Sequence, residues 1–392
     1  MESQARLRQA IDRAAMDLRL AVPSDRPAAT AALIRASARL PAGPAIEPEP
    51  DLVTGRRRAD LGVNKALQLA LEAEVDRAAA PDLAVNRLDG WADDFLAACG
   101  RLAEAEMALA HCETGFMGLV DAGGGTFDAW IASRRAPTIW RERADVDWWA
   151  AFLARRHEPE LRVIRASLAE LDRNDRERMT AYERLAGVNL QMMSYQFGYP
   201  PDAAIGGFPV RIYRDVLRRL VAAALAARDH GEDALPHSES ALVAAVATDL
   251  DLDLAVAAQA VAAFTLDRAN AAYHAAVPGV AAAPLVRLGP DRLVWSTRGL
   301  TTEPFFFLTR ELRRENAAAY HNAAYLREGV FRQDLYALFA DRRFVTSAGR
   351  VALRREGGAV RTDIDAVVFD RKTGALGIFE LKSTDPFARS TA

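Results

Sequence analysis

Cysteine and lysine are scarce in this chain of 392 residues. Its two cysteines, Cys99 and Cys112, cannot form a disulfide framework, and no histidine pair at zinc-ligand spacing accompanies them. This disfavours a disulfide-rich secreted fold, and a reducing cytoplasm is the expected compartment. Of 50 basic residues only three are lysine, namely Lys65, Lys372 and Lys382, so arginine carries nearly all of the positive charge.

Long apolar runs are also absent. The longest candidate, residues 254–264, is about half the length needed to cross a bilayer. Residues 1–21 repeat apolar positions at helical spacing among charges and lack the apolar core of a signal peptide. With 51% hydrophobic and 26% charged residues, the composition is that of a soluble globular protein of two or three domains. We therefore expect a cytoplasmic protein with no membrane partner.

The net charge of −3 is unevenly distributed along the chain. Residues 281–392 hold 18 basic against 13 acidic side chains, whereas the preceding part holds 32 against 40. A basic C-terminal segment on an acidic body is compatible with nucleic acid at one end and a protein partner at the other. An ordinary solvated surface would show the same division.

Helical periodicity dominates the chain as far as residue 279. Within residues 61–80, Val63, Leu67, Leu71 and Val75 recur four apart among polar residues. Further helical patterns cover residues 84–113, 147–186, 210–230 and 238–264. We predict an all-α body over residues 1–279, with a break near 197–209 that allows two subdomains. The sequence leaves open whether this body binds a protein partner, positions a substrate or mediates self-association.

The pattern changes near Pro278. Two β-rich stretches around Gly289-Pro290-Asp291 predict a hairpin, and residues 280–308 are expected to form a linker region around it. A long helix is predicted from 309 to 340. Three strand-like runs follow it, at 343–355, 359–370 and 375–383, separated by turn residues at 356–358 and 372–374.

A glycine-rich stretch, VDAGGGTFDAW from Val120 to Trp130, resembles the second phosphate loop of the actin-like and heat-shock-chaperone ATPase superfamily. That superfamily has a first phosphate loop near the start of its domain, and no such loop precedes this stretch. We interpret it as a glycine-rich loop between helices. An actin-like ATPase would require nucleotide binding at Gly123 to Gly125.

The chemistry is expected near the end of the chain, in TDIDAVVFD and IFELKS. Side chains alternate faces along a strand, so Asp363, Asp365 and Val367 share one side of theirs. Hairpin pairing about the turn at 372–374 brings Asp365 next to Glu380. A hard cation such as Mg²⁺ or Mn²⁺ relieves the repulsion between two such carboxylates. It can also acidify a water and stabilise charge on a phosphate.

Lys382 lies two residues after Glu380 and would stand beside this carboxylate pair. An ammonium there could orient the attacking water or neutralise phosphate charge. In a chain that prefers arginine, this position holds a compact point charge that a planar guanidinium does not imitate. The alternative is an edge hairpin with solvated carboxylates, in which Lys382 pairs with one of them.

These residues resemble the core of the PD-(D/E)xK nuclease superfamily, which has the restriction-endonuclease-like fold. Asp365 is followed by fourteen residues and then by Glu380-Leu381-Lys382, after a long helix and a strand. Ile364 replaces the proline of the motif. The resemblance implies an α/β nuclease core over residues 309–392 attached to the helical body, with magnesium or manganese as cofactor.

By this resemblance, Asp365 and Glu380 are metal ligands and catalytic residues, with the Leu381 carbonyl a third ligand and Lys382 the catalytic lysine. Glu328 is the best match for a further acidic residue from the first core helix, because it falls on a stripe with Phe331, Leu335 and Leu338. The superfamily core continues with a second helix and strand. Only ten residues follow Lys382, so the core is expected to be incomplete at its C-terminal end.

The predicted function is metal-dependent hydrolysis of phosphodiester bonds, as a magnesium-dependent (endo)deoxyribonuclease acting on nucleic acid, with DNA favoured over RNA. The alternative is a non-catalytic nucleic-acid-binding or interaction protein that carries a degenerate nuclease-like domain. Divalent-metal binding at Asp365 and Glu380 separates the two. The sequence does not distinguish endonuclease from exonuclease.

Overall fold

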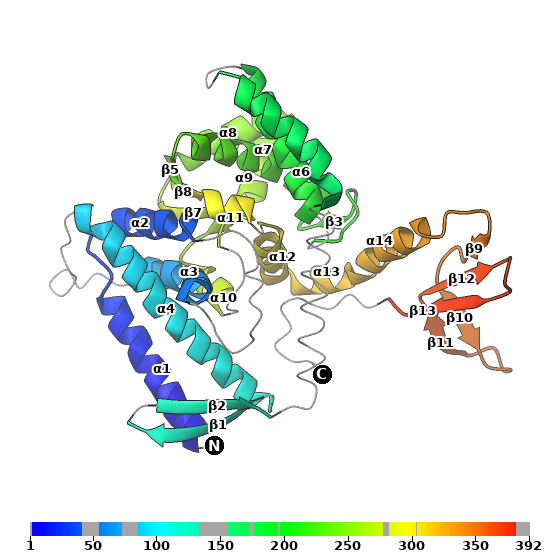
Figure 1. Cartoon of the computed structure of the whole chain (residues 1–392), viewed down its shortest axis with the longest axis horizontal. Helices are drawn as coiled ribbons and strands as arrows, with labels where there is room; N and C mark the ends of the chain where they lie inside the picture. Colours follow the sequence, from blue (N-terminus) through cyan, green and yellow to red (C-terminus); the bar gives the residue numbers. More distant parts are fainter. Residues whose placement is uncertain are drawn as a thin grey trace.

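The computed structural model describes residues 2–40, 55–72, 85–115, 117–124, 126–132, 155–172, 176–193, 197–276, 282–302 and 304–381. Two groups of helices lie on either side of a small sheet and form the body (Figure 1). An arm of three consecutive helices leads from the body to a separate group of strands. The arm comprises α12 (Pro304–Glu315), α13 (Ala317–Asn322) and α14 (Ala324–Ala337).

The sheet of the body has four strands in the order β5-β8-β7-β6. They are β5 (Ala234–His237), β6 (Thr265–Leu266), β7 (Leu285–Gly289) and β8 (Arg292–Ser296). The hairpin predicted around Gly289 is present as β7 and β8. Since β8 also pairs with β5, and β7 pairs with β6 in parallel, the region predicted as a linker is hydrogen-bonded into the body.

Two hydrophobic cores lie on opposite faces of this sheet. Leu285 and Leu293 belong to the first core, whereas the adjacent Val286 and Val294 belong to the second. This alternation explains why both strands are apolar along their length, because each face is covered by helices. Within the described residues, no helix combines the length and the apolar character needed to cross a bilayer.

The helices divide between the two cores. The first core is built by residues 155–170, α6 (Arg176–Met193), α7 (Val210–Asp229), α8 (Glu239–Leu250), α9 (Leu254–Ala262) and α11 (Thr297–Thr301). The second is built by α1 (Glu2–Leu20), α2 (Arg26–Ala38), α3 (Gly55–Glu72), α4 (Val85–Glu113) and α10 (Ala271–Ala275). The stripe predicted in α3 is confirmed at Val63 and Leu67, which are buried in the second core. Val75 lies outside the described residues.

The prediction of an all-α body was wrong, since the protein mixes helix and sheet there. Besides β5 and β6, the body contains the hairpins β1 (Met117–Gly123) with β2 (Thr126–Ile131) and β3 (Ala204–Ile205) with β4 (Phe208–Pro209). The glycine-rich stretch is therefore a strand pair and not a loop between helices. Positive φ angles at Gly123 and Gly124 form its turn, and the Asp121 carboxylate accepts the Gly123 N–H at 2.8 Å.

The long helix predicted from 309 to 340 is three helices. Asn316 leaves the helical conformation and its side chain accepts the N–H of Ala319, so it ends α12 and caps α13. A second break occurs at Ala323, between α13 and α14. In α12, Leu308 packs in the first core and Phe307 in the second, so the boundary predicted at 309 falls inside a helix that packs against the body.

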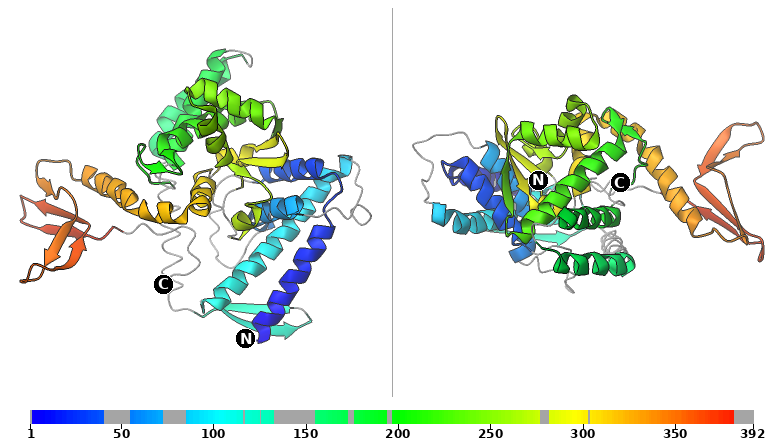
Figure 2. Two further views of the ribbon diagram at one scale, coloured as in Figure 1. Left: turned by 180° about the vertical axis from the view of Figure 1, so that it is seen from behind. Right: turned by 90° about the horizontal axis from the view of Figure 1, so that it is seen from above.

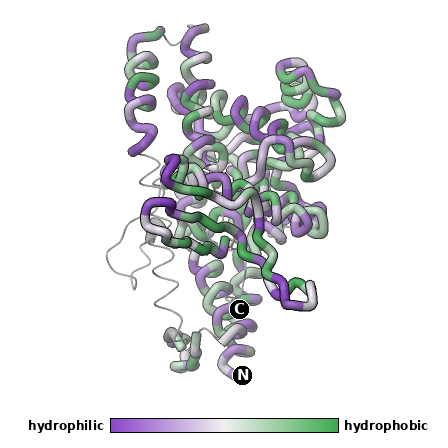
Figure 3. The backbone as a smooth tube through the Cα atoms, turned by 90° about the vertical axis from the view of Figure 1, so that its right-hand side faces the viewer, coloured by the Kyte–Doolittle hydropathy of each residue, from purple (hydrophilic) through white to green (hydrophobic). Residues whose placement is uncertain are grey.

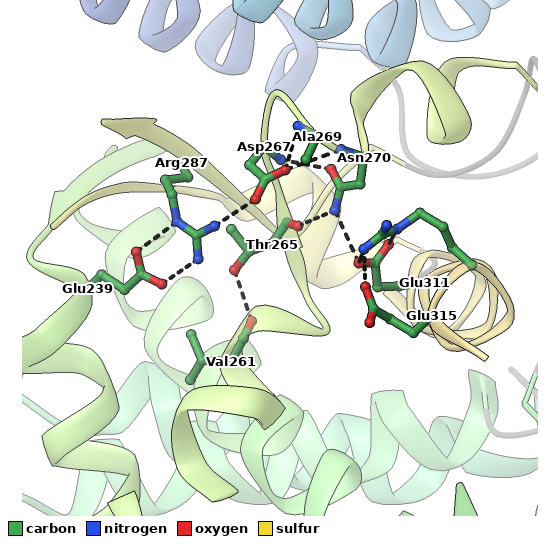
Figure 4. A network of polar contacts seen from close by, with 10 residues as sticks. Glu239, Val261, Thr265, Asp267, Ala269, Asn270, Arg287, Glu311 and Glu315 are labelled. Atoms are coloured by element: carbon green, nitrogen blue, oxygen red, sulfur yellow. Dashed lines mark hydrogen bonds and ion pairs between the residues drawn. The ribbon is translucent and has the colours of Figure 1, made fainter. Parts of the chain in front are cut away.

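A buried polar network fixes α12 to the sheet (Figure 4). Glu311 on α12 accepts hydrogen bonds from Asn270 at 3.2 Å and from Arg314 at 2.8 Å, and lies 2.9 Å from His274 Nε2. Burial alone would raise the pKa of Glu311, but the bonds from His274 and Arg314 outweigh it and lower the pKa to about 2. The start of the arm is thereby hydrogen-bonded to the body.

Beyond the arm, five strands form two small sheets (Figures 1 and 2). They are β9 (Phe344–Thr346), β10 (Val351–Arg354), β11 (Val360–Ile364), β12 (Ala366–Asp370) and β13 (Leu376–Phe379). The order is β13-β12-β9 in one sheet, and β10 pairs with β11 in the other. We call residues 324–381, which comprise the last helix of the arm, α14, and these strands, the C-terminal module. Two of the three predicted strand runs are each divided into two strands.

The three-stranded sheet is covered unequally. The ring of Phe339, just after α14, contacts the rings of Phe344 and Phe379, and the Tyr336 hydroxyl hydrogen-bonds to Ser347 at 2.6 Å. On the other face, large apolar side chains of all three strands are exposed, namely Val345, Phe369, Leu376 and Ile378. Figure 3, in which the module faces the viewer, shows hydrophobic and hydrophilic segments interspersed along it.

Candidate active site

Asp365 stands at the junction of the two sheets of the C-terminal module, in a bend between β11 and β12. Its side chain is 15% exposed and accepts the main-chain N–H of Leu381 at 2.7 Å. Its own carbonyl accepts a hydrogen bond from Arg332 Nε on α14, also at 2.7 Å. The carboxylate is therefore held by the segment that follows β13, and the backbone of Asp365 is held by the helix.

The predicted neighbourhood of Asp365 and Glu380 agrees with the strand register. β12 and β13 are antiparallel, and their last pair toward this end is Ala366 with Phe379. Continuing the same register by one residue places Asp365 opposite Glu380. Glu380 follows β13 directly and is exposed, and Asp365 directly precedes β12. The two acidic residues therefore lie at the same end of two neighbouring strands.

The turn that sets this register is stabilised by its own hydrogen bonds. The Asp370 carboxylate accepts from the Lys372 N–H and the Thr373 hydroxyl, and pairs with Arg343. The Arg343 guanidinium is the main cause that holds the pKa of Asp370 well below its usual range. Gly374 supplies the positive φ that closes the turn. Lys372 therefore contributes its backbone to this turn.

Arg350 is the residue at this site that the sequence did not reveal. Its guanidinium forms an ion pair with Glu328 and lies 3.3 Å from Asp363 Oδ2 and 3.5 Å from Asp365 Oδ1. It immediately precedes β10, and nothing in the local pattern indicates contacts with residues on α14 and β11. Asp363 lies in β11 and Asp365 in the bend that follows it, and both face this one guanidinium.

Glu328 lies at the site, but for a different reason from the one predicted. The sequence placed it on an apolar stripe of the helix. In the structure Phe331 and Leu338 of that stripe are 52% and 78% exposed, so the expected apolar environment was wrong. The Glu328 side chain is partly buried by its ion pair with Arg350. Lys382 lies outside the described residues.

The donor chemistry of the site suits a hard cation. Among the residues that the structure describes, no three His, Cys, Asp or Glu side chains are grouped so as to hold a metal ion. Mg²⁺ is commonly bound by only one or two protein carboxylates and completes its shell with water and substrate phosphate. Asp365 and Glu380 would provide such a pair, with the Leu381 carbonyl beside them.

The turn between β1 and β2 is a weaker candidate for a binding site. A hollow of about 260 Å³ there is lined by Glu2, Ser3, Arg6, Asp121 and Gly123. Arg6 already pairs with Asp121 and Glu2, so its charge is compensated within the protein. Gly125 lies outside the described residues. The geometry gives no support to a phosphate site at this turn.

Searches of family models, of curated proteins and of solved structures found no match to this chain.

Proposed function

We propose that this protein is a metal-dependent nuclease that hydrolyses phosphodiester bonds of DNA at the junction of its C-terminal sheets. The observation that supports this best is the register of β12 and β13 together with the hydrogen bond between Leu381 N–H and the Asp365 carboxylate. They set Asp365 and Glu380 at the ends of adjacent strands. In this proposal, α14 and the sheet β13-β12-β9 form a restriction-endonuclease-like core.

Each residue then has a role that its position allows. Asp365 and Glu380 hold the Mg²⁺ or Mn²⁺ ion, with the Leu381 carbonyl and Glu328 nearby. The bound metal supplies an acidified water and neutralises charge on the phosphate. The main-chain N–H of Leu381 fixes the rotamer of Asp365 before any ligand arrives. Lys382 is assigned as the catalytic lysine by its resemblance to the superfamily motif.

The surroundings of Arg350 also bear on the site. The guanidinium faces three carboxylates, so it lowers their mutual repulsion and holds them together. The body positions the module through the arm. It also binds a protein partner or mediates self-association.

One observation favours a second candidate, a nucleic-acid-binding protein without catalysis. Arg350 already pairs with Glu328, Asp363 and Asp365, and such pairing is what a degenerate metal site would retain. In this candidate the module binds the sugar-phosphate backbone and leaves it intact.

Cleavage assays separate the two candidates. Supercoiled and linear DNA are incubated with the protein in Mg²⁺, Mn²⁺ or EDTA, alongside Glu380→Ala and the control Asp334→Ala. Asp334 is an exposed acidic residue of α14, so its replacement changes the charge of the module equally. We expect metal-dependent cutting that Glu380→Ala abolishes and Asp334→Ala retains. DNA binding without cutting by the folded wild-type protein would favour the second candidate.

A further inference from the structure

The hairpin of β10 and β11 projects from the C-terminal module with solvent on both of its faces. Every residue from Ala352 to Asp363 is exposed, including Leu353 at 42% and Val360 at 54%. Two strands that alternate their side chains between faces normally bury one of them. This hairpin buries neither face within the described part of the chain, so packing in the module does not explain its shape.

The tip of the hairpin is nevertheless well defined. The N–H of Arg355 donates to the carbonyl of Ala359 and that of Gly358 to the carbonyl of Arg355, both at 2.8 Å. Gly358 adopts a positive φ, which a glycine tolerates without strain. Arg354 donates from its guanidinium to the Gly358 carbonyl at 2.9 Å. These hydrogen bonds join Arg354, Arg355, Gly358 and Ala359 and define the backbone conformation of the turn.

Positive charge predominates near the tip of this hairpin. Residues 354–361 contain three arginines and one acidic residue, Glu356. Arg361 is the extra residue of a β-bulge, since Leu353 pairs with Thr362 and Arg354 with Val360. Among the described residues, neither Arg355 nor Arg361 has a hydrogen-bond or ion-pair partner for its side chain. Arg343, elsewhere in the module, is instead paired with Asp370.

The base of the hairpin coincides with the candidate active site. β11 runs from Val360 to Ile364 and Asp365 follows it directly. Arg350, which contacts Asp365, directly precedes β10. A strand advances about 3.3 Å per residue, so the tip lies roughly 15 Å from the carboxylates along the hairpin. A long ligand bound at the tip would therefore extend back over the candidate active site.

We infer that this hairpin is a ribbon that inserts into the major groove of B-form duplex DNA and positions the duplex for the proposed nuclease site. The inference rests on the proposed function for its orientation, but its own observation is the exposed, arginine-bearing tip. The major groove of B-DNA is about 12 Å wide and admits a two-stranded ribbon. Arg355 and Arg361 contact phosphates beside the ribbon, and Asp365 then faces the sugar-phosphate backbone.

The shape of the hairpin selects among nucleic acids. The major groove of A-form RNA is too narrow and deep for protein side chains to read, so an RNA duplex cannot accept the ribbon in this way. Single strands are commonly bound by stacking on aromatic side chains, and residues 350–363 contain none. Duplex DNA is therefore the substrate class that this hairpin fits.

The test is a binding measurement in EDTA, so that cleavage plays no part. Fluorescence anisotropy of labelled DNA and RNA duplexes of the same sequence is compared for the wild type and the double variant Arg355→Ala/Arg361→Ala. Its matched control is Arg342→Ala/Arg371→Ala, which removes two exposed arginines at the opposite end of β12. Since all four arginines are exposed, we expect both variants to fold as the wild type does, which circular dichroism checks.

We expect the tip variant to bind the DNA duplex about tenfold more weakly and to lower the slope of log affinity against log salt by about 2, since two phosphate contacts are lost. The control variant should change both quantities much less, and the RNA duplex should bind more weakly than DNA. Equal loss in the two variants, equal binding of RNA and DNA, or no binding of duplex DNA by the wild type would each overturn the inference.

Failure of this inference is distinguishable from failure of the proposed function. If Glu380→Ala abolishes metal-dependent cutting while the tip variant binds DNA like the wild type, the proposed nuclease function is supported and the hairpin has no part in binding. If the tip variant loses duplex binding but no metal supports cutting, the hairpin binds DNA as inferred and the proposed nuclease activity is wrong.

Discussion

The carboxylate of Asp365 and the main-chain N–H of Leu381, sixteen positions apart in the sequence, are joined by a 2.7 Å hydrogen bond. This bond crosses from the start of β12 to the residues that follow β13. It aligns the two strand ends where the predicted acidic residues lie.

Replacing Asp365 by asparagine should stop cleavage while preserving the fold. The asparagine oxygen can still accept the Leu381 N–H, whereas the negative charge needed by a divalent cation is lost. We expect the Mg²⁺-dependent cleavage rate to fall by more than about a hundredfold, since loss of a mere supporting contact at a metal site already costs 10- to 100-fold. Urea unfolding should be nearly unchanged. A rate close to that of the wild type would remove Asp365 from the site.

Asp365→Ala provides the contrast, because it leaves the Leu381 N–H without its acceptor. Its free energy of unfolding should be lower than that of Asp365→Asn by about 1 to 2 kcal/mol. Equal stability of the two variants would mean that the hydrogen bond does not hold β12 and β13 in register.

Replacing Arg350 by alanine should make the protein depend more strongly on divalent metal. Without the guanidinium, Glu328, Asp363 and Asp365 repel one another, and Mg²⁺ can relieve that repulsion. Since Arg350 is 42% exposed, we expect its loss to cost no more than about 1 kcal/mol without metal. In thermal unfolding, added Mg²⁺ should raise the Tm of the variant more than that of the wild type.

The control for this prediction is Arg342→Ala, which removes an exposed arginine away from the carboxylates. Its Tm should respond to Mg²⁺ as the wild type does. A response in Arg350→Ala no larger than in this control would show that metal and Arg350 do not share the same carboxylates.

The pH dependence of stability should report on Glu311. Its pKa falls from an ordinary value of 4.5 to about 2 in the folded protein, so the folded state releases the proton more readily than the unfolded chain. The resulting stabilisation is complete above pH 4.5 and is lost as the pH falls toward 2, with a magnitude of about 3 kcal/mol. Burial lowers the pKa of His274, which also weakens the fold as the pH falls below 6.5.

Urea unfolding of the wild type and Glu311→Gln between neutral and acidic pH measures this effect. We expect the variant to be less stable at pH 7, because His274 and Arg314 lose a charged acceptor. Between pH 4.5 and 2 its stability should change less steeply than that of the wild type. Parallel pH profiles would show that the network in Figure 4 does not shift the titration of Glu311.

Two helical glycines should respond to alanine in opposite directions. A Cβ on Gly62 of α3 would overlap the backbone of α4 at Leu96 and Gly100, whereas a Cβ on Gly90 would meet nothing. We expect Gly62→Ala to lower the free energy of unfolding by about 2 to 3 kcal/mol through this overlap. Gly90→Ala should raise it by up to about 1 kcal/mol, because alanine favours the helix more. Urea unfolding measures the stability of both variants. A Gly62→Ala variant as stable as the wild type would contradict the close approach of α3 and α4.

Local pattern was sufficient for much of the fold. The helical periodicity of α3, the β7 and β8 hairpin around Gly289, and the β12 and β13 hairpin were all predictable from the sequence. A hairpin pairs residues that are close in the chain, so its turn residues and alternation fix its register. The placement of Asp365 opposite Glu380 follows from the same rule.

The sequence alone thus determined the local elements and the carboxylate pair at the ends of two adjacent strands. Only the tertiary structure decided that β5 and β6 join the hairpin of β7 and β8, that Asn316 breaks the long helix, and that Arg350 faces Glu328 and Asp365. These contacts join residues far apart in the chain or depend on a choice between two competing local conformations. They are decided by packing, and no short window of sequence contains the information that packing supplies.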